Sequence, residues 1–176
     1  MNDVNSNLQQ KLQNIRVLVL DVDGVLTDGR IIYNDDGVES KAFNVKDGLG
    51  IRLLMNAGIK VVVVTGRHSR ALHHRCGNLG IDHIFEGITD KKRVIGSILE
   101  LAGVTREEIA FVGDDLIDLS LMRIVGVPIA VADAHEAVRE RAEMVTSAKG
   151  GEGAVREVCE AILKARGLWE TILERY

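Results

Sequence analysis

Carboxylates and other polar side chains directly follow the apolar runs of this sequence. Asp21 and Asp23 come straight after the apolar run 17–20, and Thr65 and Asp114 each follow a later run of the same kind. Continuous apolar runs are typical of parallel strands that are covered on both faces. Because the carboxyl ends of parallel strands meet at one edge of a sheet, we expect these four side chains to face a single crevice.

The chemistry expected in this crevice is phosphoryl transfer with a divalent cation. Several carboxylates held together repel one another unless a cation lies between them, and carboxylate oxygens are ligands that Mg²⁺ prefers. Lys91 opens the helix after the third predicted strand, so Mg²⁺ and Lys91 together would attract a phosphate. Asp21 is then placed to attack phosphorus and form an aspartyl-phosphate. Asp23 is placed to protonate the leaving oxygen and later to deprotonate water.

Alternating helical and strand patterns supply the elements that must hold these residues. Four segments end a helical pattern with a glycine and continue into a strand; these glycines are Gly58, Gly80, Gly103 and Gly126. Glycine is the usual residue just past a helix end, because it adopts a left-handed backbone conformation without strain. Repeated alternation of strand and helix predicts a doubly wound, Rossmann-like α/β fold with a parallel sheet.

One segment, of about residues 29–44, interrupts this alternation. It contains two short strand patterns around NDDG, which is a β-hairpin signal. The hairpin would lie between the first strand and the first helix, over the carboxyl edge of the sheet, and no larger cap domain fits in the remaining sequence. The length of 176 residues favours a single domain over 1–176, with a C-terminal tail of about 167–176.

Four motifs, in this order, resemble those of haloacid-dehalogenase-type phosphatases. They are DVDGVLTDG at 21–29, TGR at 65–67, Lys91 and GDDLIDL at 113–119, and the resemblance covers nearly the whole chain. The resemblance implies the fold of that family, without a large cap domain.

The same resemblance implies a function for each motif residue. Asp21 would be the nucleophile and Asp23 the general acid and base. Mg²⁺ would be held by Asp21, Asp114 and the backbone carbonyl of Asp23. Thr65 and Lys91 would complete the catalytic residues by binding phosphoryl oxygens. The residues that would support the metal ligands are Asp115 and Asp118.

A narrower resemblance rests on the hairpin, on NVKDGLGIRLL at 44–54 and on GGEGAVRE at 150–157. With these features the chain is similar to the 3-deoxy-D-manno-octulosonate 8-phosphate phosphatases. That family implies release of phosphate from a sugar acid in lipopolysaccharide biosynthesis. It also implies a homotetramer in which hairpins pack together and neighbouring subunits help to close each site.

The narrower resemblance also implies which residues contact the substrate. They are Asp23, Asn44, Val45, Lys46, Asp47, Gly48, Arg52, Gly66, Arg67, Arg75, Lys91 and Arg156. The cations in this set make chemical sense, because such a substrate carries both a carboxylate and a phosphate.

Composition excludes several other classes of function. The net charge is −4, whereas general binding to nucleic acid or to an anionic membrane needs a basic surface. Residues 1–14 show no signal peptide, and no apolar run approaches the ~20 residues needed to span a bilayer. Cys76 and Cys159 lack CxxC spacing and fall on apolar helix faces, so a reduced, cytoplasmic chain with both in the core is expected. The five histidines show no HxxxH spacing, which favours packed or solvated positions.

Some residues keep a second interpretation. Lys92 competes with Lys91 for the phosphate, and Asp115 is equally a first-turn acid that complements a helix dipole. We interpret the glycine-rich segment 149–153 as an active-site lid from a neighbouring subunit, with a flexible linker as the alternative. Arg156 is equally a surface cation on the last helix.

Two other classes of function also use such residues. A regulatory receiver domain would accept phosphate on an Asp after the third strand, where this chain has Phe85-Glu86-Gly87. A non-catalytic assembly module would not need the intact set of carboxylates, threonine and lysine. Within the phosphatases, a nine-carbon sialic-acid-type 9-phosphate is the alternative substrate.

Overall fold

A single parallel sheet runs through the chain, of which a computed structural model describes residues 2–176, with side chains from residue 6 onward. The six strands lie in the order β5-β4-β1-β6-β7-β8, and every neighbouring pair is parallel. Their bounds are Val17–Leu20 (β1), Lys60–Val64 (β4), His83–Phe85 (β5), Ile109–Gly113 (β6), Val127–Ala130 (β7) and Met144–Val145 (β8). Leu20 at the end of β1 lies opposite both Val63 and Val112. The residues that follow β1, β4 and β6 therefore meet at one edge.

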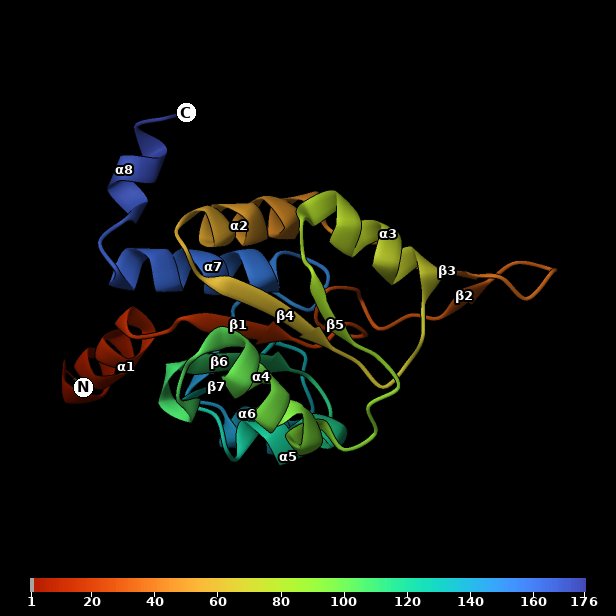
Figure 1. Ribbon diagram of the computed structural model, residues 1–176, viewed down its shortest axis with the longest axis horizontal. Coiled ribbons are helices and arrows are strands. Elements are labelled where there is room, and N and C mark those ends of the chain that lie inside the picture. The colour runs from red at the N-terminus through yellow and green to blue at the C-terminus, as the bar shows by residue number, and fades with distance from the viewer. Residues whose placement is uncertain (1) are drawn as a thin grey trace.

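Helices cover both faces of the sheet (Figure 1). α2, α3 and α7 lie on one side of the strands, and α4, α5 and α6 lie on the other. The bounds are Asn2–Gln13 (α1), Val45–Asn56 (α2), Arg70–Leu79 (α3), Ile95–Ala102 (α4), Leu119–Met122 (α5), Glu136–Arg141 (α6), Ala154–Ala165 (α7) and Trp169–Leu173 (α8). Three 3₁₀ turns are Lys91–Val94 (η1), Arg106–Glu108 (η2) and Leu116–Asp118 (η3). The predicted doubly wound fold is confirmed, and the described residues contain no large cap domain.

The core between these layers is mainly aliphatic. All four residues of β1 are buried, as are the four valines of β4, because helices cover both faces of these strands. Cys76 and Cys159 are buried and unbridged, as expected, and burial raises the pKa of the Cys76 thiol to about 11. Within residues 2–176, no helix combines the length and the apolar character that crossing a bilayer requires.

The insertion between β1 and α2 folds as the expected hairpin. β2 (Ile32–Tyr33) pairs antiparallel with β3 (Glu39–Ser40). The side chain of Asn34 accepts two backbone N–H groups of the turn, at 3.1 and 2.8 Å, and so fixes its shape. Figure 1 shows the hairpin projecting beyond the sheet, at the end of the molecule opposite to both chain termini. Its exposed apolar side chains are Ile31, Ile32, Tyr33 and Val38.

The glycine-rich segment 149–153 packs against the loop after β1 of its own chain. It is therefore not a free linker, and its function as a lid on a neighbouring subunit stays a prediction. The backbone N–H of Gly151 donates to the carbonyl of Val25 at 3.0 Å. A Cβ atom added to Gly150 would lie 1.7 Å from the carbonyl oxygen of Gly24, so only glycine permits this approach of two backbones.

The expectation that a glycine follows the end of a helix is confirmed at three of four positions. Gly58, Gly80 and Gly103 have positive φ angles of 83°, 82° and 63°. The expectation was wrong for Gly126, which does not have a positive φ. A Cβ atom there would lie 2.2 Å from the carbonyl oxygen of Glu107, so close backbone approach, not helix termination, explains this glycine.

Candidate active site

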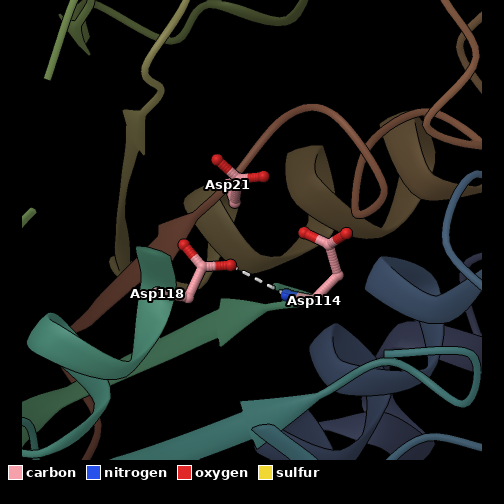
Figure 2. Close-up of side chains that lie close together, drawn as sticks. All are labelled: Asp21, Asp114 and Asp118. Atoms are coloured by element: carbon pink, nitrogen blue, oxygen red, sulfur yellow. Dashed lines mark hydrogen bonds between the residues drawn. The ribbon is translucent and has the colours of Figure 1, made fainter. Parts of the chain in front are cut away.

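Three carboxylates meet at the carboxyl edge of the sheet. Asp21 follows β1, Asp114 follows β6, and Asp118 ends η3 (Figure 2). One oxygen from each side chain lies within 4.8 Å of the others, close enough for the three carboxylates to surround one cation. Asp21 is 5% exposed and Asp118 is fully buried. The convergence of strand ends thus brings together Asp21 and Asp114, which are far apart in the sequence.

A buried lysine lies against the same carboxylates. Lys91 begins η1 and is fully buried; its ammonium donates to Asp21 and forms an ion pair with Asp118. Burial alone would lower the pKa of Lys91, but the two carboxylates raise it, so the side chain stays charged. Lys92, the competing residue, is exposed and pairs with Asp90 at 3.7 Å. Of the two lysines, Lys91 is therefore the one that faces the candidate site.

Burial and mutual repulsion disfavour the ionised forms of Asp21 and Asp114 and so raise their pKa values. Burial, opposed by Lys91 and reinforced by Asp118, raises the pKa of Asp21 from 3.8 to about 6. Burial and the charges of Asp21 and Asp118 raise the pKa of Asp114 to about 8. Carboxylates held in this way need either a proton or a further cation. Their oxygens suit a hard ion such as Mg²⁺, which Asp21 and Asp114 would hold with the backbone carbonyl of Asp23.

Asp118 also orders the loop that carries Asp114. Its Oδ2 accepts the backbone N–H of Asp114 at 2.8 Å, drawn in Figure 2, and that of Asp115 at 3.3 Å. Since Oδ1 faces Lys91, Asp118 orients both neighbours, as the predicted supporting function requires. Asp115 differs: its exposed carboxylate accepts the N–H of Leu116 at 2.7 Å and caps η3. The helix-start interpretation of Asp115 fits this geometry better than support of a metal ion.

Thr65 lies at the end of β4, beside the same edge. It is 2% exposed, and its Oγ1 accepts the N–H of Arg67 at 3.2 Å. Its backbone is fixed on both sides, because its N–H donates to Phe85 at 2.9 Å and its carbonyl accepts from Ile88 at 3.0 Å. The turn that contains Gly66 is therefore held in place at the end of β4, and its contact with phosphate stays a prediction.

The side chain of Asp23 is held by the hairpin segment. One oxygen accepts a hydrogen bond from Lys41, and the other lies 3.7 Å from Nε of Arg67. Arg67 in turn pairs with Glu39. Sequence reasoning missed Lys41 and Glu39 as site residues. They alternate with small residues inside the expected hairpin segment, which was a signal, but the sequence does not show that the end of this segment lies against Asp23.

The predicted substrate residues at the start of α2 differ in how firmly they are held. Asn44 caps α2 by accepting the N–H of Lys46 at 2.8 Å, and it donates to the carbonyl of Gly151 at 3.1 Å. Val45 and Lys46 are exposed at the surface, Val45 to 77%. These side chains lie at the helix start nearest the site, and only Asn44 is held in place.

Asp47 has a structural function that the sequence did not indicate. It is 1% exposed, and its Oδ1 accepts the N–H of Arg156 at 2.7 Å, in the first turn of α7. The N-cap residue of α7 is Gly153, which has no side chain to cap the helix. Asp47 therefore caps α7 from α2 and ties the two helices together.

The remaining predicted substrate cations differ in their surroundings. A Cβ atom on Gly48 would lie 2.2 Å from Nη2 of Arg75, which donates to the carbonyl of Asn44 at 2.9 Å. Arg75 is thus held against the start of α2. Arg52 instead donates to the carbonyl of Asn78, at the end of α3.

Arg156 is also engaged elsewhere. Its Nε donates to Glu160 at 2.6 Å, and its guanidinium lies 5.6 Å from the centre of the Trp169 ring. These contacts run along α7 and toward α8. They fit the interpretation of Arg156 as a surface cation better than the predicted substrate contact.

Known proteins are similar in sequence to this chain. A family model described as haloacid dehalogenase-like hydrolase matches residues 82–158. A 3-deoxy-D-manno-octulosonate 8-phosphate phosphatase from Escherichia coli (strain B / BL21-DE3) is 47% identical over 164 residues, covering 93% of this chain and 87% of the relative. The chain belongs to the haloacid dehalogenase-like hydrolases. It is therefore an enzyme, and the resemblance drawn from its four motifs is confirmed.

Solved structures of the same family superimpose closely on this hydrolase. The phosphatase of that name from Yersinia pestis has a TM-score of 0.92 and 46% identity, covering 93% of this chain and 89% of its own. The one from Moraxella catarrhalis, determined with a magnesium ion, a phosphate ion and KDO, has a TM-score of 0.94 and 40% identity, covering 99% of this chain and 98% of its own.

Proposed function

We propose that this hydrolase is a Mg²⁺-dependent phosphomonoesterase that converts 3-deoxy-D-manno-octulosonate 8-phosphate into the free sugar acid and phosphate. The observation that carries the proposal is the buried group of Asp21, Asp114 and Asp118 with Lys91 against it. Such a group can neutralise a phosphate while keeping a carboxylate next to the phosphorus atom. The names of the 40–47% identical relatives supply the substrate.

Four residues at this edge of the sheet, Asp21, Asp23, Thr65 and Lys91, act in two displacement steps. An oxygen of Asp21 attacks phosphorus, the bond from phosphorus to the sugar oxygen breaks, and Asp23 gives its proton to that oxygen. Water then attacks the phosphorus of the aspartyl-phosphate, Asp23 takes the water proton, and phosphate leaves Asp21. Lys91 and Thr65 bind the phosphoryl oxygens throughout. Bound Mg²⁺ supplies positive charge that offsets the charge of the phosphoryl group.

The cations near the site fit the second charge of the substrate. A sugar-acid phosphate carries a carboxylate as well as a phosphate, and Arg67 and Arg75 lie beside the hairpin and the start of α2. A guanidinium binds a carboxylate through two parallel hydrogen bonds. In this proposal Arg67 and Arg75 are the first candidates for that contact, ahead of Arg52, which contacts the end of α3, and Arg156, which contacts Glu160 on α7.

The proposal includes a cellular setting and an assembly. Removal of this phosphate is a step of lipopolysaccharide biosynthesis, in the cytoplasm. The hairpin exposes Ile32, Tyr33 and Val38 by 49–58%, and exposed apolar side chains on short edge strands favour association. We place these hairpins at the contact between subunits of a homotetramer, which leaves each active site near a subunit interface.

The two other classes of function fit the site less well. A receiver domain needs an acceptor Asp after β5, but that position holds Glu86, whose carboxylate accepts the N–H of Ser69 at 3.1 Å and contacts His73 at 2.9 Å. An assembly module has no need for a fully buried Lys91 among carboxylates. A nine-carbon sugar-acid 9-phosphate remains the alternative substrate, because it presents the same two charges.

Phosphate release tests the proposal. We expect rapid release from 3-deoxy-D-manno-octulosonate 8-phosphate with Mg²⁺, none with EDTA, and slower release from the nine-carbon analogue. Asp21→Asn keeps the shape of the side chain but is a poor nucleophile, so it should lower the rate by roughly 10⁴-fold or more.

The outcomes separate the parts of the proposal. Faster release from the analogue would keep the mechanism and change the substrate. Release from neither compound by folded, Mg²⁺-loaded protein would overturn the phosphatase assignment. An Asp21→Asn variant that retains activity would overturn the nucleophile.

A further inference from the structure

Four charged side chains form a closed ring above the site. Lys41 contacts Asp23 and also Glu39, the latter at 3.1 Å. Glu39 contacts Arg67, whose Nε lies 3.7 Å from the second oxygen of Asp23. Positive and negative groups therefore alternate around the ring. Two members, Glu39 and Lys41, come from the end of the hairpin, while Asp23 and Arg67 come from the loops after β1 and β4.

Lys41 is the most enclosed member of this ring. Its side chain is 2% exposed, against 15% for Glu39, 21% for Asp23 and 39% for Arg67. A buried ammonium is costly unless carboxylates surround it, and both neighbours of Lys41 are carboxylates. Although burial would raise it, hydrogen bonds from Arg67 and Lys41 lower the pKa of Glu39, so this partner stays charged.

Stability alone does not explain such a ring. Apolar side chains of similar volume usually stabilise a protein as well as a buried ion pair does. The hairpin itself leaves its apolar side chains exposed and adds little to the core. What the ring does achieve is orientation. Lys41 fixes one oxygen of Asp23, while Nε of Arg67 lies 3.7 Å from the other, too far for a hydrogen bond, so that oxygen remains able to carry the proton.

We propose that Lys41 is a positioning residue, which holds the Asp23 carboxyl group in the orientation needed to pass a proton to the leaving oxygen. The inference rests on the proposed phosphatase function. Glu39 keeps both cations of the ring in place. The hairpin insertion thereby acts on the chemistry of its own subunit, in addition to any contact it makes with other subunits.

The leaving group separates this function from a merely structural one. In the first step the proton of Asp23 goes to the departing oxygen as the phosphorus–oxygen bond breaks. A sugar alkoxide needs that proton, whereas p-nitrophenolate is stable enough to leave without it. The value of kcat/KM reports this first step for both substrates, because it excludes the later hydrolysis of the aspartyl-phosphate.

The experiment compares Lys41→Met, which keeps the length of the side chain but removes its charge, with the wild-type enzyme. We expect kcat/KM for the sugar-acid phosphate to fall by about 10²-fold, within the range that general acid catalysis contributes. For p-nitrophenyl phosphate it should change little. Lys41→Arg restores a cation and should recover part of the loss.

Lys11→Met is the matched control. It removes the ion pair between Lys11 and Glu143. Lys11 belongs to α1, which lies far from the hairpin (Figure 1). It should leave kcat/KM for both substrates unchanged. Equal losses for both substrates in Lys41→Met, or no loss for either, would overturn the inference.

A crystal structure of Lys41→Met provides a readout that does not depend on activity. We expect the Asp23 side chain to leave the orientation it has in the wild-type structure, while Asp21 and Asp114 stay in place. An unchanged Asp23 would overturn the inference. A wild-type enzyme that releases no phosphate from any substrate would instead defeat the proposed function. Crystal structures of the wild type and of Lys41→Met would still decide whether Lys41 positions Asp23.

Discussion

Charged side chains gather at both ends of the sheet, but their surroundings differ. At the carboxyl ends of the strands, Lys91 is fully buried between Asp21 and Asp118. At the amino ends, Lys11 and Glu143 pair at 2.7 Å with 38% and 36% of their side chains exposed. Arg16 and Glu108 form a similar exposed pair before β1 and β6.

Burial and the closeness of like charges distinguish a group of charges with a chemical function from ordinary surface ion pairs. Exposed pairs are solvated and screened, and they contribute about 0–1 kcal/mol each. The buried cluster instead keeps like charges close together, which costs stability unless cations are present. A fold gains nothing structural from placing three carboxylates at one point. The carboxyl edge is therefore the end at which stability is given up for function.

Among these variants, removal of Lys91 should have the largest effect on stability and on activity. Lys91→Met leaves Asp21 and Asp118 buried without their cation, which should lower the free energy of unfolding by about 3–5 kcal/mol. Phosphate release should also be lost, because no ammonium then faces the phosphoryl oxygens. Denaturant unfolding without Mg²⁺ measures the first effect. Lys92→Met, one residue away and exposed, is the control, and equal effects of the two variants would contradict the assignment.

Added Mg²⁺ should stabilise the folded chain by binding at the carboxyl edge. An ion that binds the folded chain alone raises the free energy of unfolding by about 2.7 kcal/mol at 100 times its dissociation constant. Thermal unfolding with MgCl₂, against NaCl of the same ionic strength, measures this gain. In Asp114→Asn the gain should shrink sharply, because one carboxylate ligand is gone. A full gain in that variant would show that Mg²⁺ binds elsewhere.

The pH dependence of stability should also come from this edge. The pKa of Asp114 is about 8 in the folded chain and 3.8 without its surroundings. Between these values the folded chain binds more protons than the unfolded chain, so without Mg²⁺ the free energy of unfolding should fall as pH rises from about 4 to 8. Denaturant titrations of wild type and Asp114→Asn isolate this contribution: their difference should change across that window and level off above it. A difference that grows in favour of the wild type with rising pH would contradict the raised pKa.

The smallest effect is expected at the amino edge. Lys11→Met removes one exposed pair and should lower the free energy of unfolding by about 0–1 kcal/mol, less at high salt. Denaturant unfolding at two salt concentrations measures it. A loss comparable with that of Lys91→Met would remove the distinction between the two edges.

The fold and the centre of the site were predictable because they follow local rules. Apolar runs without alternation indicated parallel strands, and parallel strands place Asp21, Thr65 and Asp114 at one edge whatever the details of the packing. The shortest and most polar elements escaped prediction. β8 is two residues long, and α1 carries few apolar residues, so neither has a clear periodicity.

The residues that were missed depend on how distant segments pack. Asp47 caps a helix that begins more than a hundred residues later, and no spacing in the sequence shows that the two meet. Lys41 reaches Asp23 only because the chain after β3 returns to the loop that follows β1. Gly126 and Gly150 carry no side chain because another backbone passes close to them, and a sequence shows the glycine but not its neighbour.

The contact between Gly150 and Gly24 has a consequence for the order of events during synthesis. The loop that holds Asp23 is completed by a segment that leaves the ribosome more than a hundred residues later. At about 5–20 residues per second, the delay is on the order of ten seconds. Throughout that time the nascent chain already contains Asp21 but lacks the segment that packs against the loop after it, so this loop cannot reach its final packing before Gly150 and Gly151 are in place.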